Sequence, residues 1–165
     1  MLLHGASPGE IFFIVRSKHE KDPWSGDIGF PGGKIERDES VRETAERETL
    51  EEVSIDLSSA ERLGYLEPIS GAHLPVEISC AVYYLREKPR VQRNQEVSNT
   101  FWYRIDELLS PEKFGTYPVR FGNERLTRPG IRLLPENQPI LWGITYRLLE
   151  QFFNTMKMPF PSGGT

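Results

Sequence analysis

Apolar residues recur along this chain in short runs that are separated by polar segments rich in glycine and proline. Residues 11–15, 63–69 and 76–85 form runs of strand length, which predicts three buried β-strands. Residues 1–3 are also apolar, and we expect them to end a strand whose beginning is absent from the chain. None of these runs approaches the roughly 18 apolar residues that a membrane-spanning helix needs, so no membrane association is expected.

A second set of segments has the apolar spacing of helices. Residues 140–153 predict a C-terminal helix, because apolar side chains recur there at helical intervals: Ile140, Leu141, Ile144, Leu148, Leu149 and Phe152. Residues 105–109 predict a short helix. Another helix is expected to begin near Ser40, which can act as its N-cap, since Glu43 stands three positions later and completes a capping box.

One further pair of strands is predicted in the C-terminal half. Residues 117–121 and 130–134 flank Gly122-Asn123, a dipeptide typical of a hairpin turn. Arginines gather near this predicted hairpin, where they could hold an anionic substrate or face solvent: Arg120, Arg125, Arg128 and Arg132. Exposure to solvent is the simpler interpretation.

The helix after Ser40 carries three carboxylates within five positions, Glu48, Glu51 and Glu52. At about 100° per residue, Glu52 falls inside the apolar stripe of this helix. An unpaired buried carboxylate is costly, so a cation should compensate it. Arg47 can pair with Glu43 or Glu51 one turn away, yet one arginine cannot neutralise the whole cluster. Hard divalent cations prefer oxygen ligands, and the sequence therefore predicts a magnesium or manganese site.

The order and spacing of these residues resemble the Nudix box, which seven positions match: Gly33, Glu39, Arg47, Glu48, Glu51, Glu52 and Ile55. Two positions depart from it. Thr49 replaces an aliphatic residue, and Ser54 replaces the final glycine, which usually adopts a left-handed backbone. We therefore expect an altered helix end with the carboxylates intact. The resemblance implies an α/β class fold, a Nudix-type α/β/α sandwich with a mixed sheet, and a pyrophosphohydrolase.

Hydrolysis of a diphosphate requires neutralisation of the substrate and a better nucleophile than free water, and bound metal ions provide both. Glu48 and Glu52, one turn apart, are the first candidates for direct ligands of Mg²⁺ or Mn²⁺, and Glu51 binds directly or through water. The resemblance implies that the carbonyl of Gly32 also contributes. Residues 30–33 would form the tight turn that brings this carbonyl to the metal.

Other residues are expected to support the chemistry. We expect Arg47 and Glu39 to form a pair that orients the ligands. The general base in many relatives is a glutamate on a later loop, for which Glu96 is the first candidate and Glu77 the reserve. Arg16 either binds a substrate phosphate or pairs with the carboxylate helix.

A second resemblance concerns the substrate. Residues 26–33, preceded by Arg16-Ser17, are similar to the segment before the box in coenzyme A pyrophosphatases of this family, which makes Phe30 a further candidate for substrate binding. Residues 94–97 and 140–145 are similar as well, and the likeness covers residues 11–150. The loop at residues 18–25 departs from the pattern.

This likeness implies hydrolysis of coenzyme A or its derivatives to adenosine 3′,5′-bisphosphate and 4′-phosphopantetheine. One alternative substrate class comprises ADP-ribose, NADH, dinucleoside polyphosphates and damaged nucleotides. Another alternative is a non-catalytic binding protein with the same fold.

Composition agrees with a small enzyme. The 165 residues suit a single domain spanning 1–165. A formal net charge of −4 argues against broad nucleic-acid binding, so the expected partner is a small nucleoside diphosphate derivative. Cys80 is the only cysteine, which makes a core position the simplest interpretation. A cytoplasmic location is expected because no signal pattern opens the chain, and a homodimer is possible.

Overall fold

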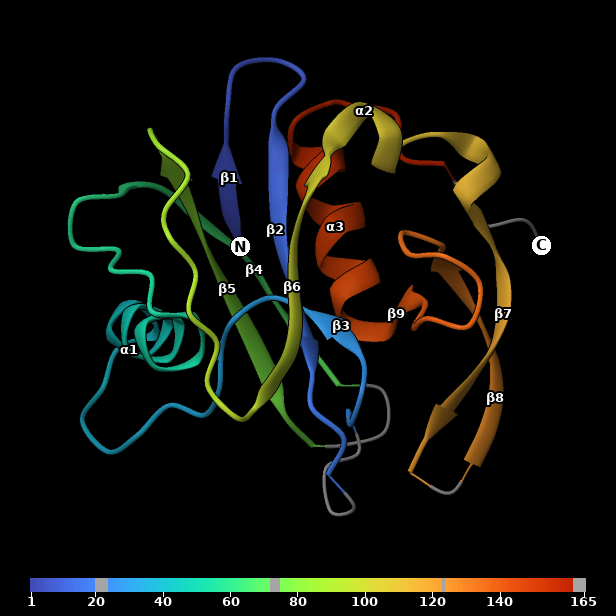
Figure 1. Ribbon diagram of the computed structural model, residues 1–165, viewed down its shortest axis with the longest axis horizontal. Helices are drawn as coiled ribbons and strands as arrows, with labels where there is room; N and C mark the ends of the chain where they lie inside the picture. The colour runs from blue at the N-terminus through green and yellow to red at the C-terminus, as the bar shows by residue number, and fades with distance from the viewer. Residues whose placement is uncertain (20–23, 72–74, 123, 162–165) are drawn as a thin grey trace.

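The computed structural model describes residues 1–19, 24–71, 75–122 and 124–161, and it contains a six-stranded sheet between two helices (Figure 1). The strands of this mixed sheet are β1 (Leu2–His4), β2 (Glu10–Arg16), β3 (Ile28–Gly29), β4 (Glu61–Ser70), β5 (Glu77–Leu85) and β6 (Val97–Arg104). Helix α1 (Val41–Val53) lies on one face and helix α3 (Gly143–Thr155) on the other. This arrangement is the expected α/β/α sandwich.

Strand β2 pairs with three other strands of the sheet, β1, β3 and β6. Strand β6 pairs with it from Glu10 to Arg16, whereas β1 and β3 share the opposite edge. Strand β1 also pairs with β5 in parallel, and the other pairs are antiparallel, which makes the sheet mixed. Successive β2 side chains point to opposite faces, so Phe13 packs toward α3 and Phe12 packs toward α1.

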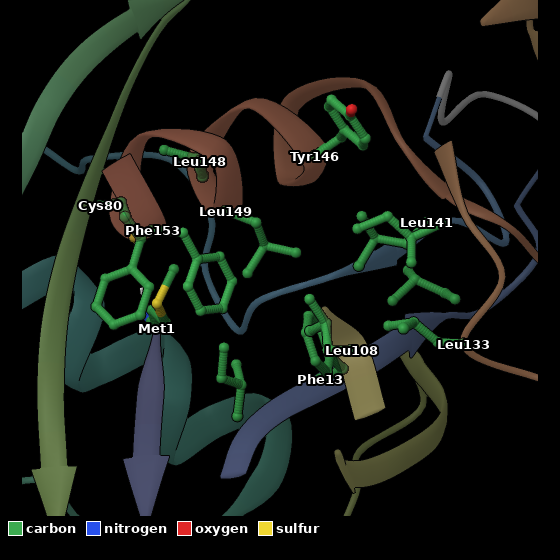
Figure 2. Close-up of a cluster of buried hydrophobic side chains, with 14 of the residues drawn as sticks. Met1, Phe13, Cys80, Leu108, Leu133, Leu141, Tyr146, Leu148, Leu149 and Phe153 are labelled. Carbon is green, nitrogen blue, oxygen red and sulfur yellow. Dashed lines mark hydrogen bonds between the residues drawn. The ribbon is translucent and has the colours of Figure 1, made fainter. Parts of the chain in front are cut away.

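The larger core lies between the sheet and α3 (Figure 2). Helix α3 contributes Leu149 and Phe153, both fully buried, and they belong to the same cluster as Phe13 from the sheet. Cys80 is buried in the same cluster, as its apolar surroundings predict. The smaller core, on the α1 side, includes Val53, which is also fully buried. Burial of apolar area on both faces fixes the order of the layers.

Helix α1 begins as the sequence predicts. Ser40 is its N-cap, and the Ser40 hydroxyl accepts from the Glu43 amide while the Glu43 carboxylate accepts from the Ser40 amide. The expectation that this helix has an altered C-terminal end is wrong. Ser54 itself adopts the left-handed conformation, with φ 57° and ψ 31°, and its amide donates to the Leu50 carbonyl at 2.9 Å. The helix therefore ends with the geometry of the missing glycine.

The C-terminal half differs from its prediction at several boundaries. The hairpin consists of β7 (Phe114–Phe121) and β8 (Glu124–Ile131), so its second strand begins earlier than residues 130–134 suggest. Gly122 has a φ of 56° in the turn, and Asn123 lies outside the described residues. The segments before the hairpin are α2 (Ile105–Leu108), as expected, and a 3₁₀ turn at Pro111–Lys113.

The predicted helix at residues 140–153 begins later than expected. Leu141–Trp142 form strand β9, which pairs with β8, and α3 starts only at Gly143. Trp142 is extended, and Gly143 has a φ of 63°, which interrupts helical geometry at this point. No helix of the described residues is long and apolar enough to cross a membrane.

Candidate active site

A cleft of about 1440 Å³ opens beside α1. The turn at residues 30–33 and the three carboxylates of the helix line it, as do residues of the hairpin and of the start of α3. The expected metal ligands Glu48, Glu51 and Glu52 therefore face one shared space. A second, shallower depression of about 540 Å³ lies along α3 and contains none of these carboxylates.

Glu52 is buried, with 1% of its surface exposed, as its place in the apolar stripe predicts. Its Oε2 accepts from the Gly32 amide at 2.9 Å, and Arg16 Nη1 lies 4.0 Å from Oε1. The pKa of Glu52 is raised to about 7, mainly by burial. The charges of Glu48 and Glu96 also raise this pKa, whereas the Gly32 amide and Arg16 lower it. The carboxylate would be ionised more readily beside an additional cation.

Arg47 connects the other acidic residues of the site. Its Nε and Nη2 donate to the two oxygens of Glu39 at 2.7 and 3.0 Å, a bidentate pair. Its Nη1 donates to Glu48 at 2.9 Å and to Glu51 at 3.1 Å, and its Nη2 also donates to the Lys34 carbonyl. Hydrogen bonds from Arg47 lower the pKa of Glu39 to about 2. The structure thus contains the expected Arg47–Glu39 pair.

Of the two helical partners expected for Arg47, the structure shows Glu51. Glu43 instead serves the N-cap, because its carboxylate accepts from the amide and the hydroxyl of Ser40. The two glutamates are each one turn away from Arg47, so the capping contact decides between them. Consequently the arginine is directed toward the carboxylates of the cleft.

Close packing explains why a glycine stands at position 33. A Cβ atom added to Gly33 would overlap the carboxylate of Glu48. The turn therefore approaches the helix closely enough to touch a metal-ligand candidate, while the Gly32 amide holds Glu52. Spacing in the sequence aligns these residues, but only the fold shows that the turn lies close to Glu48 and donates a hydrogen bond to Glu52.

The start of α3 holds the turn from the other side. Trp142 Nε1 donates to Asp27 at 3.0 Å, and Thr145 Oγ1 donates to the Ile28 carbonyl at 3.1 Å. Phe30 stacks on Phe13 of the sheet, with 5.4 Å between ring centroids, and it also lines the cleft. The sequence predicted residues 140–145 as the start of a helix and as part of a resemblance, and their contacts show that they also position β3.

The candidate general bases both line the cleft. The carbonyl of Glu96 accepts from the Ser17 amide at 2.8 Å, and the Glu96 amide donates to Asn94 Oδ1 at 2.8 Å. The Asn94 amide donates in turn to the Glu52 carbonyl at 2.9 Å, which connects this loop to the end of α1. Glu77 lies at the start of β5 and borders the same space.

The donor set fits a hard divalent cation. Three carboxylates face one cleft, and one of them is buried with a raised pKa, a combination that a cation would relieve. Within the described ranges, no group of three His, Cys, Asp or Glu side chains already has the geometry that holds a metal ion. Arginines contact the carboxylates instead: Arg47 holds Glu48 and Glu51, and Arg16 faces Glu52.

Comparison with known proteins identifies the family. The NUDIX domain model matches residues 3–121, so the chain belongs to the Nudix family. The chain is 27% identical over 146 residues to NudL of Pectobacterium atrosepticum, described as an uncharacterized Nudix hydrolase, which covers 87% of this chain and 74% of that protein. Family and relatives together support a hydrolase that acts on diphosphate bonds.

Two further comparisons concern two different proteins, a relative with a named activity and a solved structure with a similar fold. The human mitochondrial coenzyme A diphosphatase NUDT8 is 28% identical over 144 residues, which cover 85% of this chain but only 60% of that protein. The NUDIX domain of Shewanella oneidensis NrtR, solved with ADP ribose, has a TM-score of 0.56 at 19% identity. This alignment covers 94% of our chain and 83% of the NrtR chain, and it confirms the fold.

Proposed function

We propose that this chain is a divalent-metal-dependent pyrophosphohydrolase that cleaves the diphosphate of coenzyme A or of its derivatives. The observation that carries the proposal is the convergence of Glu48, Glu51 and Glu52 on one cleft that Glu96 also lines. A cleft lined by several carboxylates suits a substrate only when cations accompany it, and diphosphates bind in that form.

Glu48, Glu52 and the Gly32 carbonyl would hold Mg²⁺ or Mn²⁺, with Glu51 bound directly or through water. When bound, the ion neutralises phosphate charge and lowers the pKa of a coordinated water. The chain's own residues set the geometry. Arg47 orients two of the carboxylates, and the Gly32 amide keeps Glu52 in place.

Proton transfer requires a base within reach of the attacking water. We assign this role to the carboxylate of Glu96, whose backbone is anchored to the end of β2 and whose loop is tied to the end of α1. Glu77 is the reserve candidate. Arg16 faces Glu52 and also lines the cleft, where its guanidinium can contact a substrate phosphate, and Phe30 adds an apolar surface to the same lining.

Two features support coenzyme A as the substrate. NUDT8 is a coenzyme A diphosphatase, and its similarity extends over 85% of this chain, well beyond the box. The segments that resemble coenzyme A pyrophosphatases, residues 26–33 and 140–145, are in direct contact through the Trp142–Asp27 and Thr145–Ile28 hydrogen bonds. They form one structural unit beside the carboxylates.

The test is hydrolysis of coenzyme A, ADP-ribose, NADH, diadenosine polyphosphates and oxidised nucleotides with Mg²⁺ or Mn²⁺, with product masses identifying the bond cut. The variant is Glu52→Gln, and the matched control is Glu150→Gln on the exposed side of α3. We expect coenzyme A to be preferred and turnover to be lost only in Glu52→Gln.

Other results would correct the proposal at different levels. Preference for ADP-ribose or another nucleotide would reject coenzyme A and retain the hydrolase. Absence of metal-dependent turnover on every substrate would favour a non-catalytic binding protein with this fold.

A further inference from the structure

The β7–β8 hairpin presents two different faces. In its register, Tyr117 pairs with Arg128, Val119 with Leu126, and Arg120 with Arg125. Side chains alternate along each strand, so Arg128 shares a face with the buried Val119, and Arg125 lies on the opposite face. Arg120 and Arg125 are exposed, whereas Arg128 is half-buried.

Arg128 and Phe121, both on the inward face of the hairpin, line the same cleft as the carboxylates of α1. The hairpin and α1 stand at opposite sides of the molecule in Figure 1, with the sheet and α3 between them. Arg128 is therefore a cation that lines the cleft from the hairpin, an element other than α1. Its Nη1 donates to the neighbouring Thr127 carbonyl at 3.0 Å, which leaves other donors of the guanidinium for a ligand.

The size of the cleft indicates that it can hold more than a diphosphate. Its volume of about 1440 Å³ exceeds the roughly 300–1,000 Å³ of ordinary small-molecule pockets. A diphosphate held at the α1 end would occupy only part of it. Arg16 and Arg47 are engaged at that end by Glu52 and by Glu39, Glu48 and Glu51. Arg128, which lines the cleft from the hairpin, is a further cation that can recognise another part of the substrate.

We propose that Arg128 forms a binding subsite for a phosphomonoester that the substrate carries apart from its scissile diphosphate. This inference rests on the proposed function, because it assumes that the diphosphate lies at the carboxylates. The guanidinium fork suits a terminal phosphate, whose oxygens accept two parallel hydrogen bonds. Phe121 lies nearer the hairpin turn, four residues along from Tyr117, the partner of Arg128, and it adds an apolar surface to the same cleft.

The test measures binding rather than turnover. Isothermal titration calorimetry compares adenosine 3′,5′-bisphosphate with adenosine 5′-monophosphate in the presence of Mg²⁺, for wild type, Arg128→Gln and the control Arg125→Gln. We expect wild type and Arg125→Gln to bind the bisphosphate about tenfold more tightly than the monophosphate. Arg128→Gln should bind both equally. Circular dichroism at equal protein concentration establishes that the variants are folded.

A wild-type protein without preference for the bisphosphate, or equal losses in the two variants, overturns the subsite. These outcomes do not depend on catalysis, so they are distinct from failure of the hydrolase proposal. In the turnover assay, Arg128→Gln should raise KM about tenfold for coenzyme A and leave KM for dephospho-coenzyme A unchanged. Equal effects on both substrates would also reject the subsite.

Discussion

Helices α1 and α3 each have 13 residues and cover opposite faces of one sheet, yet they bury different chemistry. Three of the four buried residues of α1 are polar, Thr44, Thr49 and Glu52. The buried set of α3 is dominated by large apolar side chains: Tyr146, Leu148, Leu149, Phe152 and Phe153. Helix α1 is therefore weakly amphipathic, and α3 strongly so.

This difference separates stability from chemistry in the molecule. Burial of apolar area is the main favourable term in folding, and α3 provides far more of it than α1. Helix α1 instead places a buried carboxylate and an arginine network where a ligand can reach them. Substitutions in α3 should consequently lower the free energy of unfolding, and substitutions at the α1 site should lower activity.

The largest expected effect is on the α3 side. Phe153→Ala removes a fully buried ring, which should lower the free energy of unfolding by about 3–5 kcal/mol. Chemical denaturation measures it, and Met156→Ala, at an exposed position one turn further, is the control with little change. A loss below about 1 kcal/mol for Phe153→Ala would contradict the assignment of α3 as the main stabilising helix.

The opposite pattern is expected for Glu52. Glu52→Gln should reduce kcat at least about a hundredfold, because it removes a charge that the reaction needs. Without added metal, its free energy of unfolding should equal or exceed that of wild type at pH 8, since a buried charge is removed. Retained activity, or a strong loss of stability, in Glu52→Gln would contradict the assignment of catalysis to α1 and of stability to α3.

Gly33→Ala tests the contact between the turn and α1. The new methyl group would displace the flexible Glu48 carboxylate, so we expect about a tenfold loss of kcat/KM with little change in stability. Steady-state kinetics and thermal unfolding measure the two effects. Unchanged kinetics would show that the position of Glu48 does not matter for turnover.

A smaller effect is expected at the end of α1. Ser54→Gly relieves a left-handed residue of its Cβ and should raise the free energy of unfolding by about 1 kcal/mol. Ser54→Ala retains the Cβ and should give no such gain. Equal stabilities of the two variants would indicate that the serine side chain compensates for its backbone conformation.

The smallest effect concerns pH. The pKa of Glu39 is about 2 in the folded protein, below its ordinary value of 4.5, because of Arg47. This pair therefore stabilises the fold above pH 4.5, and the contribution is lost as the pH falls toward 2. Glu39→Gln should lose less stability than wild type over that interval in urea titrations. If the free energies of unfolding of wild type and Glu39→Gln changed in parallel with pH, the stabilising role of the Arg47–Glu39 pair would be contradicted.

Local patterns predicted the elements that their own residues determine. The capping box at Ser40 identified the start of α1, and the apolar run at residues 11–15 identified β2. Strand β6 was not predicted, because Ser98, Asn99 and Thr100 break its pattern and pairing with β2 defines it. A strand defined by its partner leaves little trace in its own sequence.

The candidate site shows the same division. Spacing in the box selected the carboxylates and the Arg47–Glu39 pair, which lie within one helix and the loop before it. Arg128 was left among four arginines near a hairpin, because only the strand register shows which of them faces the cleft. Its contribution depends on residues that are distant in sequence from α1.

The pairing of β2 with β6 also sets the order of events during synthesis of the chain. Arg16 and Val97 are partners in the register, so the edge of β2 that pairs with β6 stays unpaired until some 80 further residues have been made. At roughly 5–20 residues per second, this edge of β2 waits for about 4–16 s without its partner strand. Ribosome-associated chaperones would have that interval in which to bind the nascent β2, and stalling translation before residue 97 should leave the strand accessible to protease.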